Sequence, residues 1–404
     1  MTKDQSPRQE RGLGFSLSRR TFVQMGLGTL AAWLAGCRAE TEPTKTALPF
    51  PSDTPVPTNL PASAPTETAP PSPTLSSTAT EALPPTYTPV VATPTRSSAP
   101  TATPLPALDR ATLTARWPTV ARSRVVLVRH SGVWTDAGPD PAIVSQMLDE
   151  GLKTLADVPD ALAVWRALFD PDERVLLKVN CIAYNGPTQP VVTYAVARRL
   201  QDAGLRAENL LIFDRTDREL ESAGYTLNEG ASGVQCHGTR DDGSEITLSQ
   251  ARVRFFQEIE ACDALINLPT PKQHGGAGVS VALKNHYGSI DKPGALHGNW
   301  CDPAIAELNA QPTLRDKTRL IVGAALNVSP CDWNQPEREN ALLLSFDPVA
   351  LDTVGRDILV RHRQALGLSA NHLIEGARHL VTAQSLELGA TDAAQIDLRE
   401  VDLG

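Results

Sequence analysis

The chain has 404 residues, of which 41% are hydrophobic, and a formal net charge of -9. This length gives room for one large domain, or for two small ones with additional segments. The composition excludes a nucleic-acid partner. The chain is acidic and has no long basic patch to neutralise phosphates, and its aromatic content of 5% leaves few side chains on which bases could stack.

The N-terminus has the pattern of a targeting signal. Ser18–Val23 is a twin-arginine consensus, and the apolar stretch Val23–Leu34 after it is too short to span a bilayer comfortably. The stretch runs into Leu-Ala-Gly-Cys37, which resembles a bacterial lipobox. We predict that residues 1–37 are a twin-arginine lipoprotein signal peptide and that Cys37 carries the membrane lipid anchor. The protein would then be exported by the twin-arginine route and held on the extracytoplasmic face of the cell membrane. An ordinary peptidase site and an uncleaved anchor are the alternatives.

Residues 38–107 have the composition of a tether. They hold 17 of the 33 prolines and 16 threonines, with few charged or aromatic residues. Such a segment cannot bury enough apolar surface to offset its chain entropy. We expect a disordered, extended Pro/Thr-rich linker that lifts a folded domain off the membrane.

Residues 108–404 have the pattern of one α/β domain. Strand and helix signals alternate along its first half, which favours a mostly parallel sheet flanked by helices. In chain order the predicted elements are strand Arg124–Arg129, helix 141–168, strand Val175–Val179, helix Val191–Ala203 capped by Gly204, strand Asn209–Phe213, an irregular part 224–250, helix Phe255–Cys262, strand Ala264–Leu268, helix Pro303–Asn309, strands Arg319–Ala324 and Ala341–Ser345, a helix starting at Asp347-Pro348, and a surface helix within Leu366–Leu388.

The segment Cys262–Asp302 is the candidate active site. A short buried strand is followed by the small-residue turn Gly275–Gly278 and then by a helix, an order that places polar groups at the carboxyl edge of a sheet. Chemically active side chains crowd this segment: Lys272, His274, Lys284, Asn285, His286, Tyr287, His297 and Cys301. Neutral imidazoles serve as metal ligands or proton shuttles, and the lysines as electrophilic or anion-binding groups.

Two further polar groups occur at strand ends. Lys178 lies inside an apolar strand with Asn180 just after it, and a buried lysine needs an anionic partner or a ligand. Asp214 follows another strand, and the sequence fits either a structural or a functional role for its carboxylate. Asp347 is best explained as a helix cap, whereas Asp352 is ambiguous.

The five cysteines other than Cys37 contain no C-x-x-C pair, which argues against zinc ribbons and ferredoxin clusters. Cys301 with Cys331 is the disulfide we would choose, although connectivity does not follow from sequence. Buried free thiols are the alternative.

Several motifs resemble, in order, a family of bacterial and archaeal proteins known as domain of unknown function family 362. The resemblance covers most of residues 120–390. It implies no established activity; many members carry twin-arginine signals, and some are fused to ferredoxin-type modules, which this sequence lacks. The motifs are Lys178–Asn180, Ala203-Gly204, Asp263–Lys272, His274, Ala282–Asn285 with Gly288, His297, Cys301–Pro303, Ile305–Asn309 and Asp347–Asp352.

The segment from His274 to His297 also distantly resembles the nickel-pincer lactate racemase family. In that family a histidine pair does proton or hydride chemistry, and a lysine and a histidine hold the cofactor. The resemblance implies a shared fold rather than a shared activity. We predict His274, Lys284 and His297 as catalytic residues, with His274 and His297 as metal ligands. The predicted cofactor-binding residues are Lys178, Asn180, Lys272 and Asn285.

Two functions fit these features. The first is a cell-envelope enzyme that binds a transition metal or a metal-containing cofactor and catalyses a redox or isomerase-type reaction on a small molecule. The twin-arginine route favours it, because that route moves folded proteins and often cofactor-loaded ones. The alternative is a non-catalytic tethered binder of a small anionic ligand or a metal.

Overall fold

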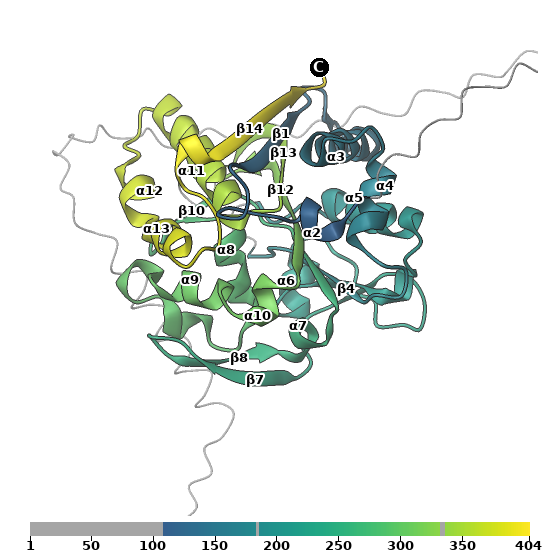
Figure 1. Cartoon of the computed structure of the whole chain (residues 1–404), viewed down its shortest axis with the longest axis horizontal. Coiled ribbons are helices and arrows are strands. Elements are labelled where there is room, and N and C mark those ends of the chain that lie inside the picture. The colour runs from purple at the N-terminus through teal and green to yellow at the C-terminus, as the bar shows by residue number, and fades with distance from the viewer. Residues whose placement is uncertain (1–107, 183–185, 332–335) are drawn as a thin grey trace, which may run out of the picture. The chain divides into compact units, whose positions relative to one another are not determined.

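The computed structural model describes residues 108–182, 186–331 and 336–404 (Figure 1). The predicted signal peptide with Cys37 and the predicted linker 38–107 lie outside these ranges. In the described part, an eight-stranded sheet has helices on both faces, which confirms the predicted α/β class. None of the helices described there is long and apolar enough to cross a membrane.

The main sheet is mixed but mostly parallel. Its strand order is β14-β1-β13-β12-β9-β4-β5-β6, and only β13 runs antiparallel to its neighbours. The strands β12 and β13 follow one another without a helix between them, so they form an antiparallel pair. The strands are β1 Ser123–Arg129, β4 Val175–Lys178, β5 Leu210–Phe213, β6 Gln235–His237, β9 Ala264–Asn267, β12 Thr318–Val328, β13 Glu337–Ser345 and β14 Ile396–Asp402.

Both faces of the sheet are covered, so the strands are apolar on both sides. In β1, Val126 and Val128 face the helices α3 to α5, whereas Val125 and Leu127 pack into the opposite core with α9, α11 and α13. This alternation is the expected two-residue period of a strand. The helices are α2 Arg110–Leu113, α3 Pro141–Ala156, α4 Ala161–Leu168, α5 Pro190–Ala203, α6 Asp217–Ser222, α7 Gln257–Ala261, α8 Ala282–Asn285, α9 Ala304–Asn309, α10 Pro312–Arg315, α11 Pro348–Ala365, α12 Asn371–Gly376 and α13 Arg378–Ser385.

Local capping fixes several helix ends as predicted. Helix α5 ends at Gly204, whose φ of 114° is the left-handed conformation that glycine adopts freely. The carboxylate of Asp347 accepts hydrogen bonds from the Val349 and Ala350 amides, so it is the N-cap of α11. The predicted helix 141–168 is two helices, because Asp157 is left-handed and Asp160 caps a new start.

The structure corrects three other predicted elements. Phe255 and Phe256 belong to strand β8, Arg252–Phe256, which pairs with β7, Asp242–Thr247, inside the part expected to be irregular. The glycine turn joins two short strands, β10 Lys272–His274 and β11 Gly278–Ser280, before α8 begins. The single surface helix expected within Leu366–Leu388 is the pair α12 and α13, and its His379 and Leu380 are buried.

The remaining elements are short. Strands β2 Trp134–Thr135 and β3 Gly138–Pro139 form a small hairpin, and single 3-10 turns connect the longer elements. The 3-10 turns are η2 Ala207–Asn209, η3 His286–Ser289, η4 Pro293–Leu296, η5 Asn299–Cys301 and η6 Ala393–Gln395.

Candidate functional site

The site begins where β9 ends at the carboxyl edge of the parallel strands. The β10–β11 hairpin carries His274, and α8 follows with Lys284. The first turn of α8 is held by Asp352 of α11, whose two carboxylate oxygens accept from the amides of Ala282 at 2.6 Å and Leu283 at 3.1 Å. Burial raises the pKa of Asp352 to about 8. The ambiguous Asp352 therefore positions the backbone that carries Lys284.

The three predicted catalytic residues come together. The Lys284 ammonium or amine donates to Nε2 of His297 at 3.4 Å and lies 3.6 Å from the ring centre of Tyr287. The rings of His274 and His297 are 5.4 Å apart between centroids. Lys284 is only 6% exposed, and within the described ranges it forms no ion pair with a carboxylate. We call Lys284, His274 and His297 the Lys–His cluster.

The environment favours the neutral forms of all three groups. Burial lowers the pKa of Lys284 to about 7, and burial together with Lys284 lowers the pKa of His297 to about 4. The pKa of His274 lies well below its ordinary value, chiefly through burial and then through Lys284 and His297. A neutral amine or imidazole nitrogen carries a lone pair, which is what proton acceptors and metal ligands require.

The two histidines hold their protons on different ring nitrogens. His297 Nδ1 donates to the Pro293 carbonyl at 2.9 Å, so its Nε2 carries the free lone pair that faces Lys284. His274 Nδ1 accepts from the Gly276 amide at 3.0 Å, so its proton is on Nε2. These hydrogen-bond partners assign the tautomers. His297 therefore presents an acceptor and His274 presents a donor.

Tyr287 and Cys301 close one side of the Lys–His cluster. The Tyr287 hydroxyl donates to the Leu296 carbonyl at 2.6 Å and lies within hydrogen-bonding reach of the Cys301 thiol. Burial raises the pKa of this thiol. Asn299, Trp300 and Cys301 all have left-handed φ values between 48° and 60°, a conformation that non-glycine residues rarely adopt. The proposed Cys301–Cys331 disulfide is wrong, because both cysteines are free.

Lys272 and Asn180 form a second polar group nearby. Lys272 Nζ donates to Asn180 Oδ1 at 2.5 Å and to the Ile182 carbonyl at 3.2 Å. Burial lowers the pKa of Lys272 to about 8, and Lys272 in turn helps to lower the pKa of Lys284. Two buried lysines thus lie close enough to interact, and neither forms an ion pair within the described ranges.

The other two predicted cofactor-binding residues have partners within the fold. Lys178 is fully buried and its Nζ lies 2.8 Å from Asp214 Oδ1, which gives the lysine the anionic partner that its burial requires. The Asn285 amide donates to the Lys178 carbonyl at 3.2 Å and to Asn267 Oδ1 at 2.8 Å. Gly288 packs against the ion pair, since a Cβ there would lie 2.8 Å from Lys178 Nζ. These contacts join α8 to the ends of β4 and β9.

Sequence reasoning missed the contribution of the C-terminal helices. His372 of α12 donates from Nε2 to the His274 carbonyl at 3.0 Å, and its ring lies 5.6 Å from that of Trp300. Gly278 and Gly376 touch through their backbones, because a Cβ on Gly278 would lie 2.7 Å from the Gly376 carbonyl carbon. The histidine content of 372–379 was the available signal. Because this segment was expected to be a surface helix, its histidines were not assigned to the site.

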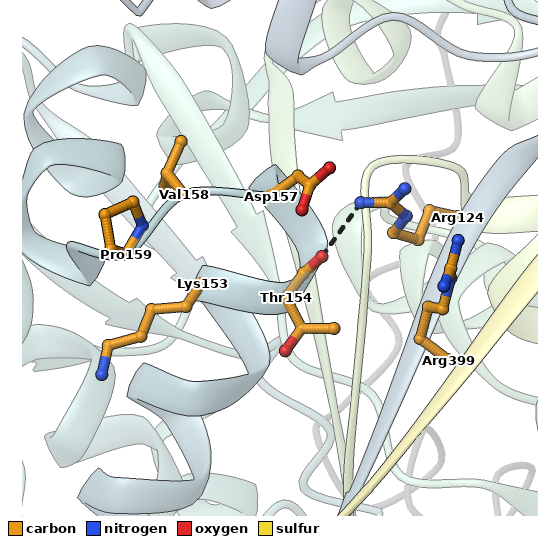
Figure 2. A pocket seen from close by; sticks show the side chains of 7 residues that line it. All are labelled: Arg124, Lys153, Thr154, Asp157, Val158, Pro159 and Arg399. Atoms are coloured by element: carbon orange, nitrogen blue, oxygen red, sulfur yellow. Dashed lines mark hydrogen bonds between the residues drawn. The ribbon is translucent and has the colours of Figure 1, made fainter. Parts of the chain in front are cut away.

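A separate hollow of about 510 Å³ shares no residue with the Lys–His cluster (Figure 2). Its basic groups already have partners: Arg124 donates to the Thr154 carbonyl at 3.0 Å, and both Arg124 and Arg399 pair with Asp397. The lining residues are Arg124, Lys153, Thr154, Asp157, Val158, Pro159 and Arg399. We therefore place the candidate site at the Lys–His cluster.

A family model matches the central part of the chain, in agreement with the resemblance noted in the sequence. The model of the family described as Domain of unknown function (DUF362) matches residues 175–357, a range that includes the Lys–His cluster but not α12 or α13. The chain is also 28% identical over 235 residues to a thylakoid-associated protein of Synechocystis sp. The match covers 53% of this chain and 72% of that protein.

Two solved structures are distantly similar. The lactate racemase apoprotein from Thermoanaerobacterium thermosaccharolyticum is 14% identical with a TM-score of 0.32, over 55% of this chain and 54% of that chain. A protein from Thermotoga maritima is 11% identical with a TM-score of 0.31, over 61% of this chain and 59% of that chain. The chain thus spans little more than half the length of either structure.

Proposed function

We propose that this protein is a lipid-anchored protein of the cell envelope whose α/β domain binds a metal or a metal-containing cofactor and catalyses a redox or isomerase-type reaction on a small molecule. The contact between Lys284 and His297 carries the proposal. A buried lysine nitrogen faces the free lone pair of an imidazole at 3.4 Å, and no carboxylate of the described ranges pairs with the lysine.

The donor set fits a late transition metal. Imidazole nitrogen suits nickel, copper, zinc and iron, and a neutral lysine amine is a nitrogen donor of similar character. Lys284 and His297 would hold the group between them, because their nitrogens already face each other. Within the described ranges no three His, Cys, Asp or Glu side chains gather as metal ligands. A metal held here would therefore complete its shell with donors from a cofactor.

His274 would act on the held group by hydrogen bonding. When bound, the metal or cofactor supplies the electron-accepting centre. His274 carries its proton on Nε2 and is the hydrogen-bond donor of the cluster, and its lowered pKa keeps the ring in the neutral form that has this single N–H. Lys284 is buried and the two histidines are half-buried, which limits the competition of water for this hydrogen bond. A fixed N–H beside a held group can stabilise the negative charge that develops there during an isomerase-type reaction.

The location in the cell envelope is supported by the sequence. The predicted twin-arginine signal would export the domain after folding, and the predicted anchor at Cys37 would keep it on the membrane. Similarity to a thylakoid-associated protein is in keeping with membrane association.

One observation favours the alternative, a non-catalytic tethered binder. Lys272 and Lys284 are both buried and neither has a carboxylate partner in the described part of the chain. A small anion between them would neutralise two lysines whose burial is otherwise unfavourable. The two functions differ in what the site retains: a metal or cofactor in the first case, a carboxylate or similar anion in the second.

Metal analysis of the full chain separates these functions. The protein would be extracted from membranes in mild detergent, and its metal content and absorption spectrum would be compared with those of Lys284→Ala and His297→Ala. Lys292→Ala is the matched control, because that lysine is 62% exposed in its side chain and pairs with Asp291. We expect a stoichiometric transition metal in the wild type and the control, and its loss in both cluster variants.

Two other results decide against this function. A metal-free wild type that binds acetate, and loses that binding on Lys284→Ala, would establish the anion binder instead. Metal retained at wild-type stoichiometry in Lys284→Ala and His297→Ala would show that the metal lies elsewhere, and the Lys–His cluster would no longer be the site.

A further inference from the structure

His379 of α13 is a buried histidine without hydrogen-bond partners. It is 0% exposed, and neither ring nitrogen contacts a donor or acceptor in the described ranges. His286 shows the usual arrangement, since its two nitrogens lie 3.1 Å from the Asn267 amide and 3.2 Å from the Ser289 hydroxyl. Buried polar groups are rarely left unpaired, so His379 requires a specific explanation.

The position of His379 connects it with the Lys–His cluster. Helix α13 packs against η5, which contains Cys301, and against α9. Lys284 is close enough to lower the pKa of His379, and His379 is close enough to lower the pKa of His274. His379 thus approaches the cluster from the C-terminal helices, whereas His274 approaches it from the β10–β11 hairpin.

We propose that His379 is a further residue of the site and hydrogen-bonds, from α13, the group that Lys284 and His297 hold. This inference rests on the proposed metal or cofactor function and adds a residue that lies outside the matched family range. A neutral imidazole offers one N–H donor and one lone pair, so it can contact either a donor or an acceptor atom of the bound group. The burial without partners is then explained, because the bound group supplies the partner.

Replacement of His379 by Phe tests this role, with Zn²⁺ as the probe. The variant removes both nitrogens and breaks no hydrogen bond of the fold, so its urea unfolding midpoint should equal or exceed that of the wild type. Zn²⁺ affinity of the full chain, measured by calorimetry, should fall by roughly tenfold or more, as for other groups that support a metal site. His286→Phe is the matched control. It loses two hydrogen bonds and should unfold at lower urea while keeping its Zn²⁺ affinity.

A second measurement does not depend on the variant folding. The ¹⁵N resonances of His379 in the wild type should shift when Zn²⁺ is added, as those of His297 should. Resonances of His379 that stay in place, or unchanged Zn²⁺ affinity in His379→Phe, would overturn the role of His379 alone. A wild type that binds no Zn²⁺ would overturn the proposed metal site and this inference together.

Discussion

Replacing Asp214 by Asn tests whether Lys178 belongs to the framework of the domain or to its site. Lys178 Nζ lies 2.8 Å from Asp214 Oδ1, and the two side chains are 0% and 6% exposed. The Asp214 carboxylate also accepts from the Cys181 amide at 2.6 Å and the Arg215 amide at 2.8 Å. Asn cannot neutralise the lysine, and its NH₂ group must face one of these donors. Breaking a buried ion pair from one side costs about 3–5 kcal/mol, and we expect a loss of that size.

The companion variants divide this loss into its parts. Lys178→Met should cost less than Asp214→Asn, because the carboxylate keeps its two amide donors. The double variant should be more stable than Asp214→Asn alone, since no unpaired charge remains. Urea unfolding of the full chain gives the midpoints. Asp316→Asn is the surface control and should lower the free energy of unfolding by at most about 1 kcal/mol. An Asp214→Asn midpoint equal to that of the wild type would refute this reasoning, and a bound ligand would then be the partner of Lys178.

Three further predictions concern targeting, the tether and pH. Replacing Arg19 and Arg20 by Lys should retain the protein in the cytoplasm, and Cys37→Ala should abolish labelling with a radioactive fatty acid; normal export of the double-Lys protein would contradict the signal. Removing residues 1–107 should leave the thermal midpoint of the domain unchanged, whereas a drop of many degrees would mean that the tract packs on the fold. The pKa of Lys272 is lowered from 10.5 to about 8. Between these values the unfolded chain binds more protons than the folded one, so stability should rise with pH over that window, and Lys272→Met should flatten the rise.

The elements that the sequence predicted well are those with a strong local signal. Helix α5 has a proline at its start and Gly204 at its end, and β4 and β9 are short apolar runs. The predicted helix Phe255–Cys262 is observed as α7, but its first two residues end strand β8, which is too short to show a period and whose place is set by pairing with β7. The antiparallel direction of β13 depends likewise on pairing, although two successive strands without a helix between them were a signal for it.

The candidate site likewise combines contacts within one short segment, which the sequence predicts, with contacts that depend on how distant elements pack. His274, Lys284 and His297 are close in sequence, so a hairpin, one helical turn and the 3-10 turns η3 and η4 suffice to bring them together. The partner of Lys178 depends on the register of β4 with β5, in which Lys178 lies beside Phe213 and therefore next to Asp214. The position of His379 depends on how α13 packs. No local pattern encodes such contacts.

The strand order also governs when the domain can fold during synthesis. Strand β1 is made first, yet its two neighbours in the sheet are β13 and β14, with Val125 beside Ser345 on one side and Leu398 on the other. A nascent chain therefore cannot pair β1 until the ribosome has made nearly all of the domain. His379, which we infer to contact the bound group, also emerges late. Any cofactor held by His379 would then be inserted only after α13 has been made, and a transport system that accepts folded proteins suits such a topology.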